Sequence, residues 1–186
     1  FKHCLINAAH QFTNRSEGEA YIIAGYPWFK CRARDMFISL PGLTLAIDEK
    51  AKYEEMMTTA SKAIRNFIND EPDNLKVYEM EHPDVLLWAV WCIQQYAKMV
   101  SKEECIEKYG ALLAEIMEYL CNENHPNLFL HGNGLLYTNG HDRAVTWMNS
   151  TANGRPVIPR TGYVVEINAL WYNALCFVAD LLGKEE

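Results

Sequence analysis

The sequence lacks any uninterrupted apolar segment long enough to cross a membrane. Its longest purely apolar run, Val85 to Ile93, has nine residues, about half of what a bilayer span requires. Basic residues are also few, since 17 Lys and Arg stand against 24 Asp and Glu, for a formal net charge of −7. An acidic balance disfavours nucleic-acid backbones and anionic membrane surfaces. We therefore expect no nucleic-acid partner and no membrane partner.

The sequence also lacks the usual signatures of metal, redox and nucleophilic sites. Its six cysteines are too far apart for a zinc knuckle or a CxxC pair. It contains no His-Glu-x-x-His pattern and no nucleophile elbow. Because several cysteines, Cys92 and Cys176 for example, lie among apolar residues, we predict buried free thiols in the reducing cytoplasm. We expect neither a metal ion nor a cofactor.

The sequence does contain a series of helical patterns. From Tyr53 to Ile68, apolar residues recur at steps of three and four, as in an amphipathic helix. Comparable patterns predict helices over 4–12, 34–47, 84–100, 101–120 and 164–181. Pro41 should kink or interrupt the second of these. Strand-like alternation is confined to 20–24 and 135–138. The fold class predicted is all-α, with residues 1–186 forming a single domain or a fragment of one.

Long loops between the predicted helices are the first indication of function, since such loops usually carry it. They hold aromatic and charged or polar side chains, namely Tyr26, Trp28, Phe29, Arg32, His131, His141, Asp142, Trp147, Arg155 and Arg160. Aromatic rings pack on the apolar face of a pyranose, while Asp, Glu and Arg bind its hydroxyls. Taken alone, this composition leaves two hypotheses, a sugar-binding cleft and a surface for protein contacts.

Two segments resemble a known family. Residues 25–45 read GYPWFKCRARDMFISLPGLTL, and residues 145–175 read VTWMNSTANGRPVIPRTGYVVEINALWYNAL. Both closely resemble the C-terminal glucosidase region of glycogen debranching enzymes, the amylo-α-1,6-glucosidases. Between them, His82-Pro83-Asp84 resembles an Asp-containing segment of the same family. The resemblance runs from about Ile22 to Leu182, nearly the whole chain.

The resemblance implies an (α/α)6 toroid, whose sugar-binding cleft is formed by loops at one end of the inner ring of helices. Six predicted helices make about half of such a barrel, so we expect a partial toroid, as a fragment of a longer polypeptide or as a remnant. The inner-ring surface that half a toroid leaves uncovered should favour self-association. The activity implied is inverting hydrolysis of α-1,6-linked glucose at branch points of an α-glucan, which requires two carboxyl groups.

Neither carboxyl group can be assigned from the resemblance. The family's general acid is the Asp of a Thr-Trp-Met-Asp motif, which here reads Thr146-Trp147-Met148-Asn149. Asn149 has no titratable proton to deliver, and the family's base lies beyond Glu186. The catalytic residues therefore stay unknown. Three hypotheses remain: a glucosidase domain, a degenerate homologue that binds α-glucan without cleaving it, and a helical protein-interaction module.

The resemblance and the residue types together give candidates for substrate contact, namely Trp28, Arg34, Asp35, Asp84, Trp147 and Glu166. Arg34 and Asp35 either grip adjacent hydroxyls or form an ion pair at a helix start. Asp84 either binds a hydroxyl or caps its helix, and Glu166 is either a ligand group or a partner of the helix dipole.

The five tryptophans are likewise assigned to one of two roles, substrate contact or core packing. Trp28 and Trp147 lie in loops and are the candidate stacking platforms, whereas Trp88, Trp91 and Trp171 lie on helical stripes and are predicted core. We predict that the candidate contact residues converge on one concave end of the domain.

Overall fold

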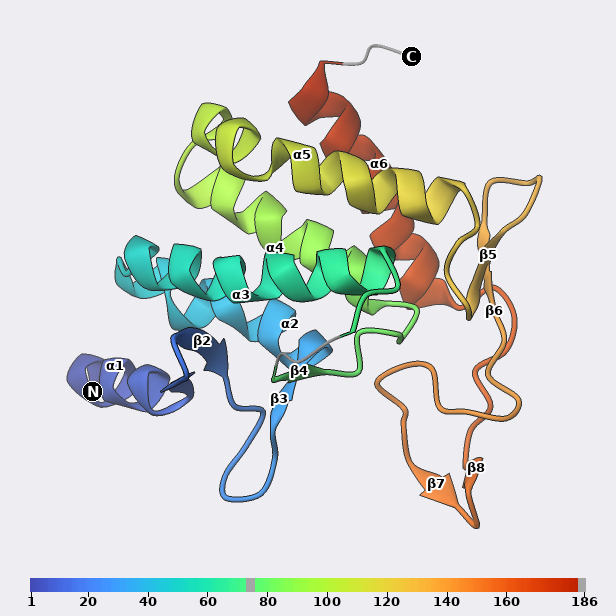
Figure 1. The fold of residues 1–186 in the computed structure, drawn as a ribbon, viewed down its shortest axis with the longest axis horizontal. Coiled ribbons are helices and arrows are strands. Elements are labelled where there is room, and N and C mark those ends of the chain that lie inside the picture. The colour runs from blue at the N-terminus through green and yellow to red at the C-terminus, as the bar shows by residue number, and fades with distance from the viewer. Residues whose placement is uncertain (73–75, 184–186) are drawn as a thin grey trace.

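The fold comes from a computed structural model that describes residues 1–72 and 76–183. Within these ranges it contains six α-helices (Figure 1): α1 (Lys2–Gln11), α2 (Ala33–Leu43), α3 (Lys50–Ile68), α4 (Val85–Met99), α5 (Lys102–Cys121) and α6 (Val165–Leu182). A short 3-10 helix, η1 (Leu45–Ile47), follows α2. The predicted all-α class is confirmed.

Short strands pair two by two between the helices. Three pairs are antiparallel: β1 (Thr13–Ser16) with β2 (Glu19–Ile22), β5 (Leu128–Leu130) with β6 (Leu136–Thr138), and β7 (Thr151–Ala152) with β8 (Arg155–Pro156). The fourth pair, β3 (Cys31–Arg32) with β4 (Val77–Tyr78), is parallel. The sequence predicted only the regions of β2 and β6. The others were missed because two to four residues are too few to show an alternation.

Local signals set several helix ends. The Ser101 hydroxyl accepts the Glu104 backbone N–H at 3.1 Å, so Ser101 is the N-cap of α5, at the start of the predicted helix 101–120. Gly183 adopts a left-handed conformation (φ 62°) after α6, as expected of a C-cap. The prediction of one helix over 34–47, kinked or interrupted at Pro41, is wrong about where the helix ends. Helix α2 continues through Pro41 to Leu43 and ends there, because the Thr44 backbone leaves the helical conformation (φ −131°, ψ −70°). The Thr44 hydroxyl donates to the Leu40 carbonyl at 2.5 Å.

Helix α4 occupies the centre of the molecule. It packs against α2 on one side and α6 on the other, and α5 covers both α4 and α6. Ten of its 15 residues are buried, as its apolar first half predicted. Trp171 is buried, and Trp88 and Trp91 pack partly buried against the core, as predicted. This order of α2, α4 and α6 in one layer is compatible with half of a toroid, but the partial toroid itself stays a prediction.

A cluster of tyrosines joins α3, α4 and α5. Tyr53 and Tyr109 both pack on the ring of Tyr96, at centroid distances of 5.1 and 5.2 Å. The Tyr53 hydroxyl donates to the Cys92 carbonyl at 2.9 Å, and the Tyr96 hydroxyl donates to a Glu54 carboxylate oxygen at 2.6 Å. Because the Tyr53 and Tyr96 hydroxyls both have hydrogen-bond partners, their burial leaves no polar group unsatisfied. The same contacts fix α3, α4 and α5 relative to one another.

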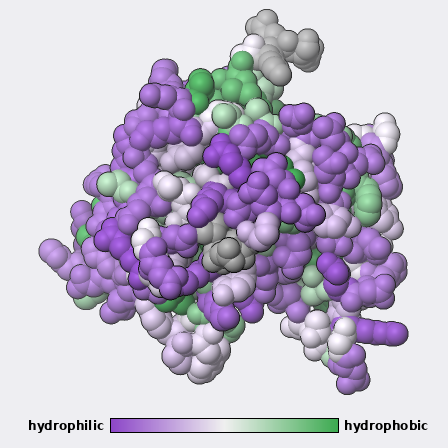
Figure 2. All heavy atoms as spheres, in the orientation of Figure 1, coloured by the Kyte–Doolittle hydropathy of each residue, from purple (hydrophilic) through white to green (hydrophobic). Residues whose placement is uncertain are grey.

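One face of α6 is uncovered. Val165 and Tyr172 are 81% and 71% exposed, whereas Ile167 and Ala174 bury the opposite face. Figure 2 shows a mostly hydrophilic surface, with hydrophobic atoms gathered at the upper end, over the C-terminal part of α6. By length and composition alone, α6 is the one helix of the described residues that could cross a membrane. A core helix has the same composition, and the predicted self-association stays a prediction.

All six cysteines are free, but only three are buried. Burial raises the pKa of the Cys31 and Cys92 thiols to about 12. Cys105 is also buried, whereas Cys4, Cys121 and Cys176 are exposed. The prediction of buried free thiols is therefore wrong for Cys176, since this residue falls on the uncovered face of α6.

We predict that acid destabilises the fold through His125, which is 2% exposed. Burial lowers its pKa from 6.5 to about 4, so between these pH values the unfolded chain binds a proton that the folded chain does not. The free energy of unfolding should therefore fall by about 3 kcal/mol as the pH drops from 7 to 4.

The measurement is urea denaturation of the wild type and of His125→Gln across this pH range. The variant should be less stable at pH 7 but should show a smaller loss on acidification. Equal pH dependence in both proteins would contradict the role of His125.

Candidate functional site

A buried ion pair lies where α2 and α4 begin. Arg34 belongs to the first turn of α2, and Asp84 directly precedes α4. Arg34 Nε and Nη2 donate to the two Asp84 carboxylate oxygens at 2.7 and 2.8 Å. Nη2 also donates to His82 Nδ1 at 2.9 Å, and burial together with the Arg34 charge lowers the pKa of His82. The pair is 7% and 2% exposed, so each charge depends on the other.

The observed ion pair bears on the alternatives that the sequence left open for Arg34 and for Asp84. Arg34 forms its ion pair with Asp84, 50 positions away, and not with the adjacent Asp35. The Asp84 side chain makes no capping hydrogen bond to α4. Both side chains use their hydrogen-bonding atoms on each other and are buried, which suits them to hold the ends of α2 and α4 together. Their predicted contact with a substrate stays a prediction.

Asp35, by contrast, is exposed in the first turn of α2, where the helix dipole favours a carboxylate. It borders a hollow of about 290 Å³ lined mostly by apolar side chains, Phe12, Ile22, Ile38 and Leu43 among them. The Ser39 hydroxyl donates to the backbone carbonyl of Asp35 at 2.6 Å and leaves its carboxylate free. The Asp35 carboxylate is therefore available to a ligand.

The loop before β3 presents two aromatic rings and a guanidinium. Trp28 is 76% exposed, and its ring lies 6.3 Å from that of Phe29. The Arg32 guanidinium lies over the Phe29 ring at 5.3 Å, within the range of a cation–π contact. The Trp28 ring thus projects from a braced loop and offers a face for stacking.

The Trp147 segment is anchored by two buried residues that precede it. Val145 and Thr146 are 1% and 0% exposed, and the Thr146 hydroxyl accepts the Met148 backbone N–H at 3.2 Å. Trp147 itself is 60% exposed and lines a hollow of about 270 Å³ with Val157 and Ile158. Asn149 is half-buried beside it. An exposed indole on a fixed backbone is a stacking surface of low entropic cost.

Arg160 connects this segment to α6. Its Nη2 forms an ion pair with the Glu166 carboxylate, in the first turn of α6. Its Nη1 donates to the Met148 sulfur at 3.0 Å. The guanidinium that binds Glu166 therefore also contacts Met148, the residue that precedes Asn149. Sequence reasoning named Arg160 as a loop residue but did not place it against Glu166.

The loop that contains these residues is closed at its base. Thr138 and Gly162 exchange backbone hydrogen bonds, each at 3.0 Å. Next to them, Gly140 lies so close to Arg160 that a β-carbon would sit 2.8 Å from the Arg160 carbonyl oxygen. Only glycine fits this approach. The residues between 141 and 159 are thus fastened at both ends.

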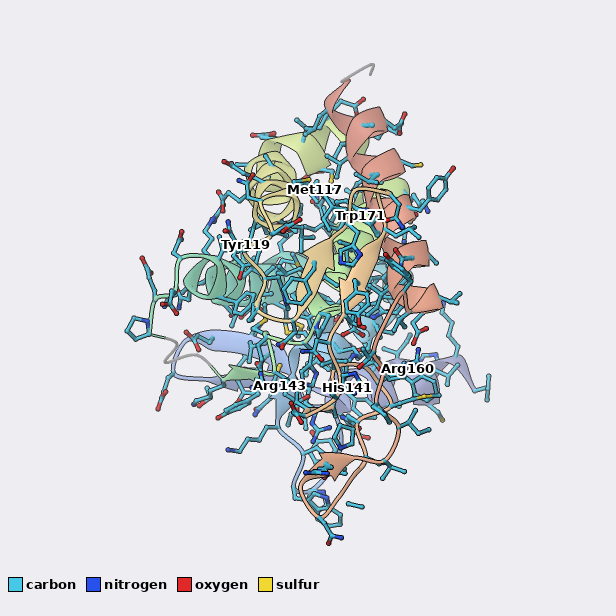
Figure 3. The ribbon with its side chains drawn as sticks, turned by 90° about the vertical axis from the view of Figure 1, so that its right-hand side faces the viewer. Met117, Tyr119, His141, Arg143, Arg160 and Trp171 are labelled. Atoms are coloured by element: carbon cyan, nitrogen blue, oxygen red, sulfur yellow. The ribbon has the colours of Figure 1, made fainter. Side chains whose placement is uncertain are left out.

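Both loops project from the same end of the molecule. Figure 1 shows the segment before β3 and the β7–β8 segment extending downward, and Figure 3 shows the same from the side, with Arg143, His141 and Arg160 below Trp171. Asp35 and Trp147 border different hollows, however. The predicted convergence of all six candidates on one concave surface therefore stays a prediction.

A groove between α3 and α5 was not predicted from the sequence. Its volume is about 790 Å³, and its walls include Glu54, Ser61, Arg65, Lys108 and Tyr109. The groove arises where two amphipathic helices diverge, which no local pattern encodes. Within residues 1–72 and 76–183, no group of three or more His, Cys, Asp or Glu side chains could hold a metal ion.

Comparison with protein-family models gave a match over nearly the whole chain. The amylo-alpha-1,6-glucosidase model matches residues 7–186. The chain belongs to this family. Searches of curated proteins and of solved structures gave no significant match. In this member of the amylo-alpha-1,6-glucosidase family, Trp147, Asn149, Arg160 and Glu166 all lie within residues 145–175, one of the two segments whose motifs resemble the family.

We predict that Asp84→Asn lowers the free energy of unfolding by about 3 kcal/mol, because it leaves the buried Arg34 charge without its partner. The matched control is Glu115→Gln. Glu115 forms a two-bond ion pair with Arg65 at 2.8 and 3.1 Å, but both side chains are at least 40% exposed. Loss of this exposed pair should cost less than about 1 kcal/mol. Urea denaturation measures both, and equal losses would contradict the structural role of Asp84.

Proposed function

We propose that this chain recognises the α-1,6-linked glucose at branch points of an α-glucan, as part of a glycoside hydrolase domain of the inverting type. The supporting observation is that the family model spans residues 7–186. The side-chain chemistry supports the proposal, since the exposed indoles of Trp28 and Trp147 and the exposed carboxylate of Asp35 suit a neutral sugar.

Each candidate residue has a role in this proposal. Trp28 and Trp147 stack on glucose rings, and Asp35 and Glu166 accept hydrogen bonds from hydroxyls. Arg160 orients Glu166 through the ion pair described above. The Arg34–Asp84 pair acts as a positioning pair, because it is buried and holds Asp35 at the start of α2.

Hydrolysis needs a carboxylic acid and a carboxylate about 6.5–9.5 Å apart. Asn149 cannot be the acid, and Glu166 is engaged by Arg160. We therefore propose that this chain binds the branch and does not itself supply both catalytic groups. The second candidate function, a homologue that binds α-glucan without cleaving it, is favoured by the same observation at Asn149. The free cysteines support a reducing compartment such as the cytoplasm.

We predict that the purified chain releases no glucose from isomaltose or from a branched α-glucan. A positioned acid or base contributes about 10²–10⁴-fold each, so a chain that does not supply both should have little activity. Asn149→Asp supplies the missing carboxyl group, and Asn153→Asp, in the exposed turn between β7 and β8 of the same loop, is the control of equal charge. A glucose-release assay compares the three proteins.

Hydrolysis by the unmodified chain would contradict this prediction and would point to another donor, such as Asp142 or Glu166. Activity gained by Asn149→Asp but not by Asn153→Asp would assign the acid position. The same comparison applies in any longer natural polypeptide that contains this chain.

Sugar binding is tested separately from hydrolysis. We predict that the chain binds maltoheptaose in a calorimetric titration and that Trp147→Ala weakens this binding about threefold to tenfold, as expected from the loss of one aromatic contact. Tyr172→Ala, which removes an equally exposed ring from the uncovered face of α6, should leave binding unchanged. If the wild type binds neither maltoheptaose nor isomaltotriose, the α-glucan proposal is wrong and the protein-interaction module becomes the better hypothesis.

A further inference from the structure

Three rings form a cluster between the β5–β6 hairpin and α6. His131 stacks on Tyr137 with centroids 5.1 Å apart and planes inclined by 14°. Tyr163, two residues before α6, stands nearly perpendicular to both rings, at 88° and 87°. Its hydroxyl and His131 Nδ1 form a hydrogen bond of 2.6 Å. The Tyr163 ring therefore stands at nearly a right angle to the stacked rings of His131 and Tyr137.

The backbone that carries these rings is fixed to α6 by side chains of that helix. The Asn168 amide accepts from Leu136 N at 2.9 Å and donates to Leu136 O at 3.0 Å. One turn further along α6, the Trp171 indole N–H donates to the Gly134 carbonyl at 3.1 Å. A site fixed in this way before the ligand arrives loses little conformational entropy on binding.

The rings are fixed but not covered. Tyr163 is 45% exposed and His131 is exposed as well. Within the described residues, no protein group bonds to His131 Nε2, which leaves this nitrogen for a ligand hydroxyl.

The segments 130–139 and 161–165 that surround the rings contain no Asp, Glu, Lys or Arg. Next to segment 161–165, the charged residues Arg160 and Glu166 are paired with each other. Next to segment 130–139, the nearest charged residues along the chain are Glu123 and Asp142. Uncharged aromatic surroundings favour a neutral ligand with an apolar face and hydroxyl groups, which is the chemistry of a pyranose.

We propose that Tyr163 and His131 form a stacking site for one glucose ring of the α-glucan, adjacent to Glu166 at the start of α6. One face of the Tyr163 ring packs on the glucose ring, and His131 Nε2 forms a hydrogen bond with one of the glucose hydroxyls. The proposal rests on the proposed function, since it names further substrate contacts of the same binding surface. The alternative is that the three rings only pack on one another and fasten the hairpin.

The experiment titrates the full chain with maltoheptaose and records calorimetry together with the NMR signals of the His131 ring. In the wild type, the His131 signals should shift as maltoheptaose is added, and the dissociation constant fitted to these shifts should equal the one from calorimetry. Tyr163→Ala and His131→Ala should each weaken binding about threefold to tenfold. Tyr163→Phe keeps the ring and should weaken it no more than about twofold. Tyr172→Ala is again the matched control on α6.

Thermal unfolding identifies any variant that fails to fold. If Tyr163→Ala is unfolded, Tyr163→Phe and His131→Ala with the NMR titration still decide the question. Unchanged binding in folded Tyr163→Ala and His131→Ala, with weakened binding in Trp147→Ala and Glu166→Gln, would overturn the stacking site and leave the proposed function standing. Absence of any glucan binding by the wild type would overturn both.

Discussion

The arrangement of the candidate site depends on the buried contact between Arg34 and Asp84. A charge taken out of water without a partner costs several kcal/mol, so neither residue is tolerated alone. Their two parallel hydrogen bonds fix both the distance and the angle between the beginnings of α2 and α4. The loop that carries Trp28 leads into α2, and the segment that carries His82 leads into α4. The positions of both therefore follow from this one contact.

Most of the helical framework could be predicted from the sequence, because each helix carries its own evidence. The apolar stripe of α3, the Ser101 cap of α5 and the Gly183 end of α6 are local patterns that can be read from a few residues. The end of α2 could not be predicted in the same way, because the helix continues through Pro41, the local stop signal, and ends only where the Thr44 backbone leaves the helical conformation. The order in which α2, α4 and α6 pack is a tertiary property, and no local pattern encodes it.

The candidate site could be predicted only as a set of residue types. The sequence placed Trp28 and Trp147 in loops, and both are exposed in the structure. An indole in a polar loop has little apolar surface to pack against. The partners of the charged residues could not be predicted. Arg34 was expected to act with its neighbour Asp35, but its partner lies 50 positions away, and Glu166 is bound by Arg160 across a loop. Pairing of charges depends on proximity in space, which spacing in the sequence does not show.

The closure of one loop at Thr138, Gly140, Arg160 and Gly162 has a consequence for how such a protein can diversify. Because the base of the loop is fixed by backbone contacts, substitutions at the exposed positions between residues 141 and 159 should leave the packing of the six helices unchanged. The exposed side chains of this loop can then vary independently of the residues that determine folding. A difference such as Asn in place of Asp at position 149 would in this way alter the chemistry of the loop without loss of the fold.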